Sequence, residues 1–170
     1  MSQKAFPFAG GGGMIRAADF SPCKTWRYTL RRTWKSDRRR LLWVLLNPST
    51  ADETRDDPTN RRGIRFAYSW GYGSLVFCNL FAIRTPEPAE MKKAADPVGP
   101  RNNGWILDEA HEADKIVLGW GIHGPHRGRD REVLDLLKGF ELYCLGRTKD
   151  GQPRHPLYMK KSTPLERFTL

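Results

Sequence analysis

Four short apolar runs recur along the chain, and each is followed by a loop rich in polar residues. They are LLWVLL from Leu41, SLVFCNLFAI from Ser74, KIVLGWG from Lys115 and FELYCLG from Phe140. They do not alternate regularly between apolar and polar residues, which is typical of strands covered on both faces, as in a parallel sheet. The stretch from Trp26 to Trp34 alternates partially and predicts a further strand.

Helical patterns lie between these runs. Asp57 followed by Pro58 is typical of an N-cap with proline at the first helical position, and this helix is expected to end at Gly71. A second helix is expected to start at Asn102 or Asn103, and a third covers DREVLDLLKG. The alternation predicts an α/β fold: a three-layer α/β/α sandwich with a mainly parallel sheet of about four strands and an N-terminal β extension.

Length and charge restrict the possible partners. We place a single domain over residues 14–170 and a flexible tail over residues 1–13. Lys and Arg number 29 against 19 Asp and Glu, a net charge of +10 that favours a polyanionic partner, DNA first of all. Three irregularly spaced cysteines form no zinc or disulfide pattern, and no apolar run has membrane length. We therefore expect a cytoplasmic monomer with no membrane partner.

The loop after the first apolar run, NPSTADETRDDP, holds the first candidate site residues. Asn47 can orient a water or hold a carbonyl group, and it can equally serve only to cap the turn. Ser49, Thr50 and the N–H groups beyond Pro48 can bind a phosphate. Carboxylates of the same loop are candidate bases; Asp57 is better suited to capping the helix, so Asp52 ranks above it.

Two further residues stand out in later loops. Asn79 lies in an apolar run, where its amide must pair with neighbouring backbone or face a ligand such as a base edge. His155, in RHPLY, is either structural or able to stabilise an anionic leaving group or grip a phosphate. His123 and His126 lack a third ligand at suitable spacing, so we expect no metal and no other cofactor.

These motifs, in this order, resemble those of the uracil-DNA glycosylase superfamily: a strand ending in Asn-Pro, CNLF, VLGWG and a final His-Pro. LNPSTAD with DDPT and RHPLY is similar, more closely, to a bacterial and phage family catalogued as a domain of unknown function. The resemblance covers about Trp26 to Phe168. It implies a glycosylase-like fold and a DNA glycosylase that hydrolyses the N-glycosidic bond of a flipped damaged or hypermodified base, with a role against phage carrying modified DNA.

The resemblance also implies residue roles. Asn47 matches the residue that positions the attacking water, Asn79 the asparagine that reads the base, and His155 the histidine that faces the departing base. Ser49 stands where the uracil-specific enzymes have a tyrosine, and Leu157 stands where a serine is usual. These departures predict a roomier base pocket.

Three groups of candidate residues result. The catalytic candidates are Asn47, Asp52 and His155. The substrate-binding candidates are Pro48, Ser49, Thr50, Asp57, Asn79 and Tyr158, and the DNA-binding candidates are Arg38, Arg39, Arg40, Arg61, Arg62 and Arg154. Two alternative functions stay open: a non-catalytic nucleic-acid-binding module of the same fold, and a hydrolase of free nucleosides or nucleotides.

Overall fold

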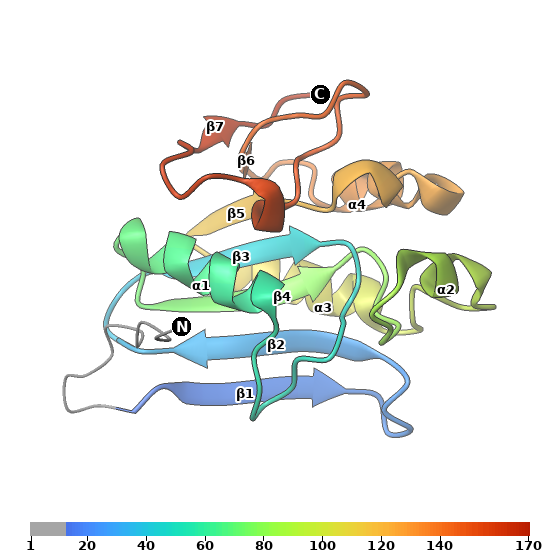
Figure 1. Ribbon diagram of the computed structural model, residues 1–170, viewed down its shortest axis with the longest axis horizontal. Helices are drawn as coiled ribbons and strands as arrows, with labels where there is room; N and C mark the ends of the chain where they lie inside the picture. Colours follow the sequence, from blue (N-terminus) through green and yellow to red (C-terminus); the bar gives the residue numbers. More distant parts are fainter. Residues whose placement is uncertain (1–12) are drawn as a thin grey trace, which may run out of the picture.

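One seven-stranded sheet forms the centre of the molecule in the computed structural model, which describes residues 13–170 (Figure 1). The spatial order is β1-β2-β4-β3-β5-β6-β7, so β1 and β7 form the two edges. The strands are β1 Ile15–Phe20, β2 Arg27–Thr33, β3 Arg40–Leu45, β4 Ser74–Asn79, β5 Lys115–Leu118, β6 Leu142–Cys144 and β7 Glu166–Arg167. Of the expected flexible tail, all but Gly13 lies outside the described residues.

The expectation of a mainly parallel, glycosylase-like sheet of about four strands is wrong. The sheet is mixed: β3–β4, β3–β5 and β5–β6 pair in parallel, whereas β1–β2, β2–β4 and β6–β7 are antiparallel. The expected N-terminal β extension is part of the sheet itself, because β2 pairs with both β1 and β4 in antiparallel orientation. The edge strand β7 was not expected, because it is only two residues long and exposed.

Helices cover both faces of the sheet (Figure 1). Their bounds are α1 Pro58–Ser69, α2 Pro88–Lys93, α3 Asn102–Glu112 and α4 Arg129–Leu136, with short 3-10 turns η1 Gly121–His123, η2 His126–Gly128 and η3 Pro156–Tyr158. On one face α1 packs its Ile64 and Phe66 over Trp43 and Phe77. On the other face α2, α3 and α4 contribute to a second apolar cluster. No helix within residues 13–170 is long and apolar enough to cross a membrane.

The start of α1 follows from Asp57 and its close packing from Gly63. The Oδ1 atom of Asp57 accepts a hydrogen bond from the backbone N–H of Asn60 at 2.8 Å, which confirms the predicted N-cap. Gly63 lets the helix approach the sheet, because a Cβ there would lie 2.6 Å from Cε1 of Phe77. α1 therefore begins at a fixed place beside the end of β3.

The loop between β3 and α1 is held against the sheet by a buried cation. Arg32 of β2 has no exposed side-chain surface, and its Nε donates to Oδ1 of Asp56 at 2.9 Å. Its Nη2 donates to the backbone oxygen of Asp52 at 2.5 Å. Arg16 of β1 reaches the other oxygen of Asp56 at 2.9 Å. These bonds draw the loop across the face of the sheet that α1 covers and fix the polar residues that it carries.

Candidate functional site

The loops that follow the parallel strands gather at one edge of the sheet, the edge formed by the carboxyl ends of β3, β4 and β5 and not by β1 or β7. Backbone bonds continue the pairing beyond the strand ends: Leu80 N donates to Leu45 O and Gly119 N to Val44 O, each at 2.9 Å. The turn between β1 and β2 reaches the same edge, because β2 runs antiparallel to β4. Residues from distant parts of the chain therefore meet at this edge.

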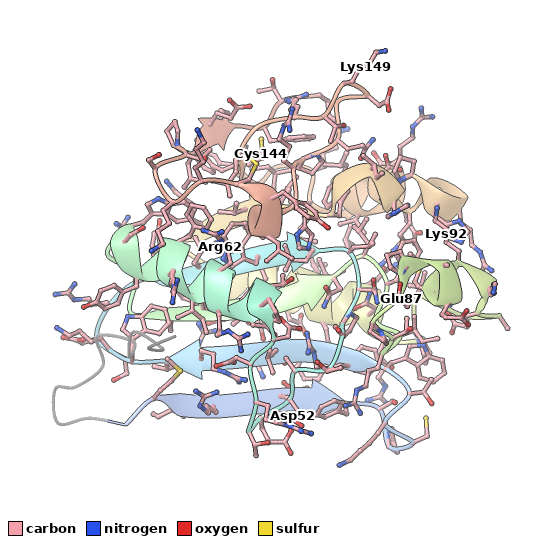
Figure 2. All side chains as sticks on the ribbon, viewed as in Figure 1. Asp52, Arg62, Glu87, Lys92, Cys144 and Lys149 are labelled. Atoms are coloured by element: carbon pink, nitrogen blue, oxygen red, sulfur yellow. The ribbon has the colours of Figure 1, made fainter. Side chains whose placement is uncertain are left out.

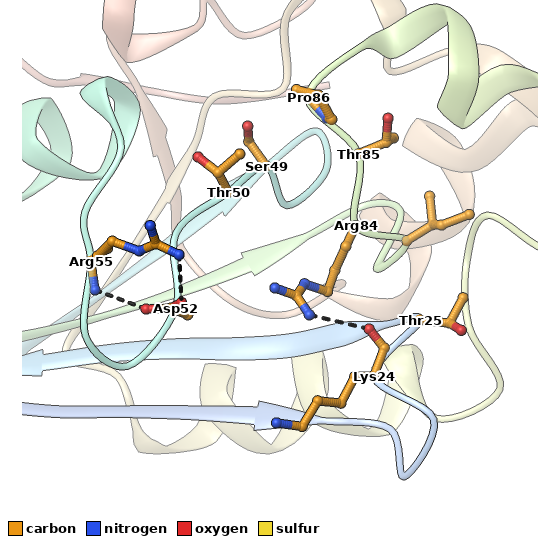
Figure 3. Close-up of a pocket in the computed structure, with 10 residues that line it drawn as sticks. Lys24, Thr25, Ser49, Thr50, Asp52, Arg55, Arg84, Thr85 and Pro86 are labelled. Atoms are coloured by element: carbon orange, nitrogen blue, oxygen red, sulfur yellow. Dashed lines mark hydrogen bonds and ion pairs between the residues drawn. The ribbon is translucent and has the colours of Figure 1, made fainter.

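A cleft of about 550 Å³ opens among these loops (Figure 3). Its walls come from the β1–β2 turn, the loop after β3 and the segment after β4. The lining residues are Lys24, Thr25, Ser49, Thr50, Asp52, Arg55, Ile83, Arg84, Thr85 and Pro86. Three cations and four hydroxyl groups face one carboxylate in this set. A cleft of this composition is suited to an anionic, nucleotide-sized ligand.

Asp52 is bound within its own turn. Its Oδ1 accepts from the hydroxyl of Thr54 at 2.7 Å and from the backbone N–H groups of Thr54 and Arg55 at 2.8 Å. The bond from the Thr54 hydroxyl, followed by the two backbone bonds, lowers the pKa of Asp52 to about 2. An aspartate with so low a pKa is a poor proton acceptor at neutral pH. The geometry thus favours a structural role in the cleft wall over the predicted catalytic one.

Asn47 is fixed at the end of β3 by two backbone carbonyl groups. Its half-buried side chain donates from Nδ2 to Thr85 O at 2.8 Å and to Pro48 O at 3.1 Å. Both N–H groups are used, and Oδ1 accepts no hydrogen bond from residues 13–170. The oxygen is thereby held as an acceptor on the opposite side of the amide. This arrangement can orient a water molecule.

His155 is held in one tautomer beside the same edge. Its Nδ1 accepts from the backbone N–H of Leu157 at 3.2 Å, so the proton of the neutral ring resides on Nε2. Burial lowers the pKa of His155 to about 4. At neutral pH the ring is therefore uncharged and donates through Nε2–H. The exposed ring of Tyr158 lies against it, 5.7 Å between centroids.

The segment that carries His155 lies over the ends of β3 and β5. A Cβ on Gly119 would lie 3.0 Å from both Leu45 Cδ2 and Pro156 Cδ, which shows how closely this segment approaches β3. Gly121 N also donates to Pro153 O at 2.8 Å. Asn47 follows Leu45 by two residues, so it and His155 belong to one region. Neither side chain lines the cleft itself, and they make no hydrogen bond to each other.

Asn79 ends β4 with a side chain that is 2% exposed. Its Nδ2 has no hydrogen-bond partner among the described residues. Strand alternation places it on the α1 side, because Leu75 and Phe77 pack there. An unpaired buried amide is costly, which is compatible with the predicted contact to a ligand. That role stays a prediction.

The predicted DNA-binding arginines fall in separate places. Arg61 and Arg62 lie on α1. In Figure 2 Arg62 lies near η3, whereas Asp52 lies well away from η3 in the loop between β3 and α1. Arg154 is exposed beside His155. By contrast, Arg38, Arg39 and Arg40 lie at the amino end of β3, a six-residue strand that separates them from Asn47. They do not line the cleft, and their contact with DNA stays a prediction.

Several cleft residues were missed by sequence reasoning. Lys24 and Thr25 lie in a turn that carries no obvious motif, and their approach to the loop after β3 depends on the antiparallel pairing of β2. Arg55 was not selected as a binding candidate, because the carboxylates on either side of it in the sequence were considered instead. Arg84 and Thr85 had a signal, because they directly follow the apolar run of β4, where strand-end residues gather.

The fold and the cleft define an α/β protein with a basic cleft where the parallel strands end. The chain belongs to the family described as "Protein of unknown function (DUF1643)", whose model matches residues 27–157. This confirms the predicted similarity to a domain-of-unknown-function family. The matched span holds Asn47, Asn79 and His155. No curated protein and no solved structure matches the chain.

Proposed function

We propose that the protein is a DNA glycosylase that releases a base by hydrolysing its N-glycosidic bond. The observation that carries the proposal is Asn47: both of its N–H groups are bound by backbone carbonyls, which leaves Oδ1 fixed as an acceptor near the strand ends. The neutral His155 in the same region adds a donor. The order of the Asn-Pro, CNLF and His-Pro motifs, which resembles the uracil-DNA glycosylase superfamily, supports the same reaction.

The reaction needs a group at each end of the bond that breaks. As the C1′–N bond lengthens, the sugar gains oxocarbenium character and the base gains negative charge. Asn47 Oδ1 accepts a hydrogen bond from the attacking water, whose oxygen bonds to C1′ and whose proton passes to solvent. His155 Nε2–H donates to the departing base and stabilises its charge. The departing base then takes up a proton from solvent.

The partner would be a nucleic acid with one nucleotide turned out of its stack. The cost of extrusion, a few kcal/mol, must be offset by contacts to the sugar-phosphate chain. Lys24, Arg55 and Arg84 supply positive charge in the cleft for this purpose. Three free cysteines agree with a reducing cytoplasm as the place of action. We propose that one chain acts as a monomer.

An abasic-site assay tests the proposal. Duplexes that carry uracil, hydroxymethylated or glucosylated bases would be incubated with protein, and alkali would then cleave the DNA strand at abasic sites. We expect cleavage by the wild type and a loss of at least about a hundredfold in Asn47→Ala, because the water loses its orienting group. Asn103→Ala is the matched control, since Asn103 is exposed on α3 and donates to Glu132 at 3.1 Å.

Two further measurements, hydrolysis of free nucleosides and nucleotides and binding of DNA, separate the alternatives. Turnover of free nucleosides or nucleotides, without cleavage of duplexes, would replace the proposal with a hydrolase of monomers. DNA binding without turnover of any tested DNA or monomer would replace it with a non-catalytic binding module.

A further inference from the structure

A buried arginine stands directly behind the cleft. Arg27, the first residue of β2, is 2% exposed, and its Nη1 donates to the backbone oxygen of Ala51 at 2.7 Å. The residues on either side of Ala51, Thr50 and Asp52, line the cleft. The guanidinium is therefore bound to the backbone of the loop that forms one wall of the cleft.

The charge of Arg27 is poorly compensated. It forms no ion pair with any carboxylate of residues 13–170, and its Nε has no hydrogen-bond partner there. Asp57 acts on it through space, but that carboxylate caps α1. Arg32 and Arg84 act on it as like charges. A buried cation in this setting is costly unless an anion is supplied from outside the chain.

The pKa of Arg27 agrees with this account. Burial, opposed by Asp57 and assisted by Arg84 and Arg32, lowers that pKa to about 10. The group therefore remains charged at neutral pH in spite of its burial.

The cations that face the cleft are also held in place. Arg84 lies with Cζ 4.7 Å from the centroid of the Phe20 ring, and Nζ of Lys24 lies 5.7 Å from the same centroid. Arg84 Nη1 donates to Lys24 O at 3.3 Å (Figure 3). Lys24 itself has a φ of +58°, a left-handed conformation that is unfavourable for a lysine. The turn thus holds a residue in a left-handed conformation in the cleft wall, while its ammonium group points away from Ser49 and Thr50 (Figure 3).

We propose that this cleft is a phosphate-binding subsite, in which Arg84 contacts the phosphate, Lys24 adds positive charge from the cleft wall, and the buried Arg27 supports the phosphate from behind that wall. The hydroxyl groups of Ser49 and Thr50 supply neutral donors to the same oxygens. The inference deepens the proposed function and rests on it: the phosphate is a diester of the DNA chain that flanks the target nucleotide. The cleft, with a volume of about 550 Å³, admits a nucleotide unit as well as the phosphate.

Binding of a labelled thymidine oligonucleotide of about twelve nucleotides, followed by fluorescence anisotropy at several salt concentrations, tests the proposal. We expect Arg84→Gln to weaken binding about tenfold and to reduce the slope of log K against log salt by about 0.7, the value for one lost contact on a single strand. Arg27→Gln should weaken binding about threefold, since its charge acts at longer range. Arg131→Gln, which removes an exposed charge from α4, is the matched control and should leave both quantities unchanged.

If Arg27→Gln prevents folding, Arg84→Gln still tests the proposal, because Arg84 is only half-buried. Unchanged affinity and salt slope in Arg84→Gln, or equal losses in Arg131→Gln, would overturn the phosphate subsite. Competition by thymidine 5′-monophosphate identifies the source of the phosphate. We expect the monophosphate to displace the oligonucleotide poorly, whereas efficient displacement would assign the subsite to a phosphate monoester and overturn the diester.

The binding assay does not depend on turnover, so the two proposals fail separately. A protein with the expected Arg84 dependence but no base release would keep the subsite and lose the glycosylase. A protein that releases bases and binds normally after Arg84→Gln would keep the glycosylase and lose the subsite.

Discussion

Acid should destabilise the folded protein through His155. Burial lowers the pKa of this imidazole to about 4 in the folded state, whereas an exposed imidazole has a pKa of about 6.5. The unfolded state therefore binds more protons between these two values. The corresponding stability is fully present above pH about 6.5 and is lost as the pH falls towards 4.

The size of the effect follows from the two pKa values. Each pH unit between them contributes about 1.4 kcal/mol, so lowering the pH from about 7.5 to about 4.5 should remove about 2.5 kcal/mol of unfolding free energy through this one histidine. His155→Gln keeps a polar side chain of similar size without the titrating group. Acid should therefore cost the variant about 2.5 kcal/mol less than it costs the wild type.

Urea unfolding at the two pH values, for wild type and His155→Gln, measures this difference. Acid protonates the remaining carboxylates and histidines in both proteins, so their contributions cancel in the comparison. A proton NMR titration of the His155 ring gives the pKa directly. Titration near the ordinary value, or equal acid losses in both proteins, would refute the neutral ring and with it the donor role of Nε2–H.

Three further predictions concern the elements that position the site. Gly63→Ala should destabilise the protein by about 1 kcal/mol in urea unfolding, because the contact with Phe77 outweighs the gain in helix propensity; a more stable variant would contradict this packing. Asp57→Ala should cost about 1 kcal/mol in the same assay through the lost N-cap, with Asp108→Ala, exposed on α3, as the control. Glu109→Ala should lower the unfolding free energy by about 2 kcal/mol, because this buried carboxylate binds Arg31; a loss below about 0.5 kcal/mol would show that the buried carboxylate contributes little.

The sequence predicted the parts of the fold whose signals are local. Asp57-Pro58 marks the start of α1 because both capping and proline preference act within one turn. The strand at Leu41 could be located because each of its residues from Leu41 to Leu45 is buried. The pairing of β2 with β4 was not predictable, because antiparallel insertion of a hairpin depends on contacts far apart in the chain.

The candidate site was predicted in part for the same reason. Asn47 could be selected because it precedes a proline at the end of an apolar run. His155 could be selected because it precedes a proline in the loop that follows the last apolar run. Arg27 could not be recognised, because nothing local distinguishes a buried arginine from the exposed arginines that are common in this chain. Its burial depends on the loop after β3 folding over the start of β2.

Release of a free base is the most direct test of the central claim. Wild type and Asn47→Ala would be incubated with genomic DNA that carries modified bases, and released bases would be identified by mass spectrometry. The account predicts that the wild type releases one class of base and that Asn47→Ala releases it at least about a hundredfold more slowly. Intact DNA after incubation with the wild type, or release that is unchanged by Asn47→Ala, would contradict it.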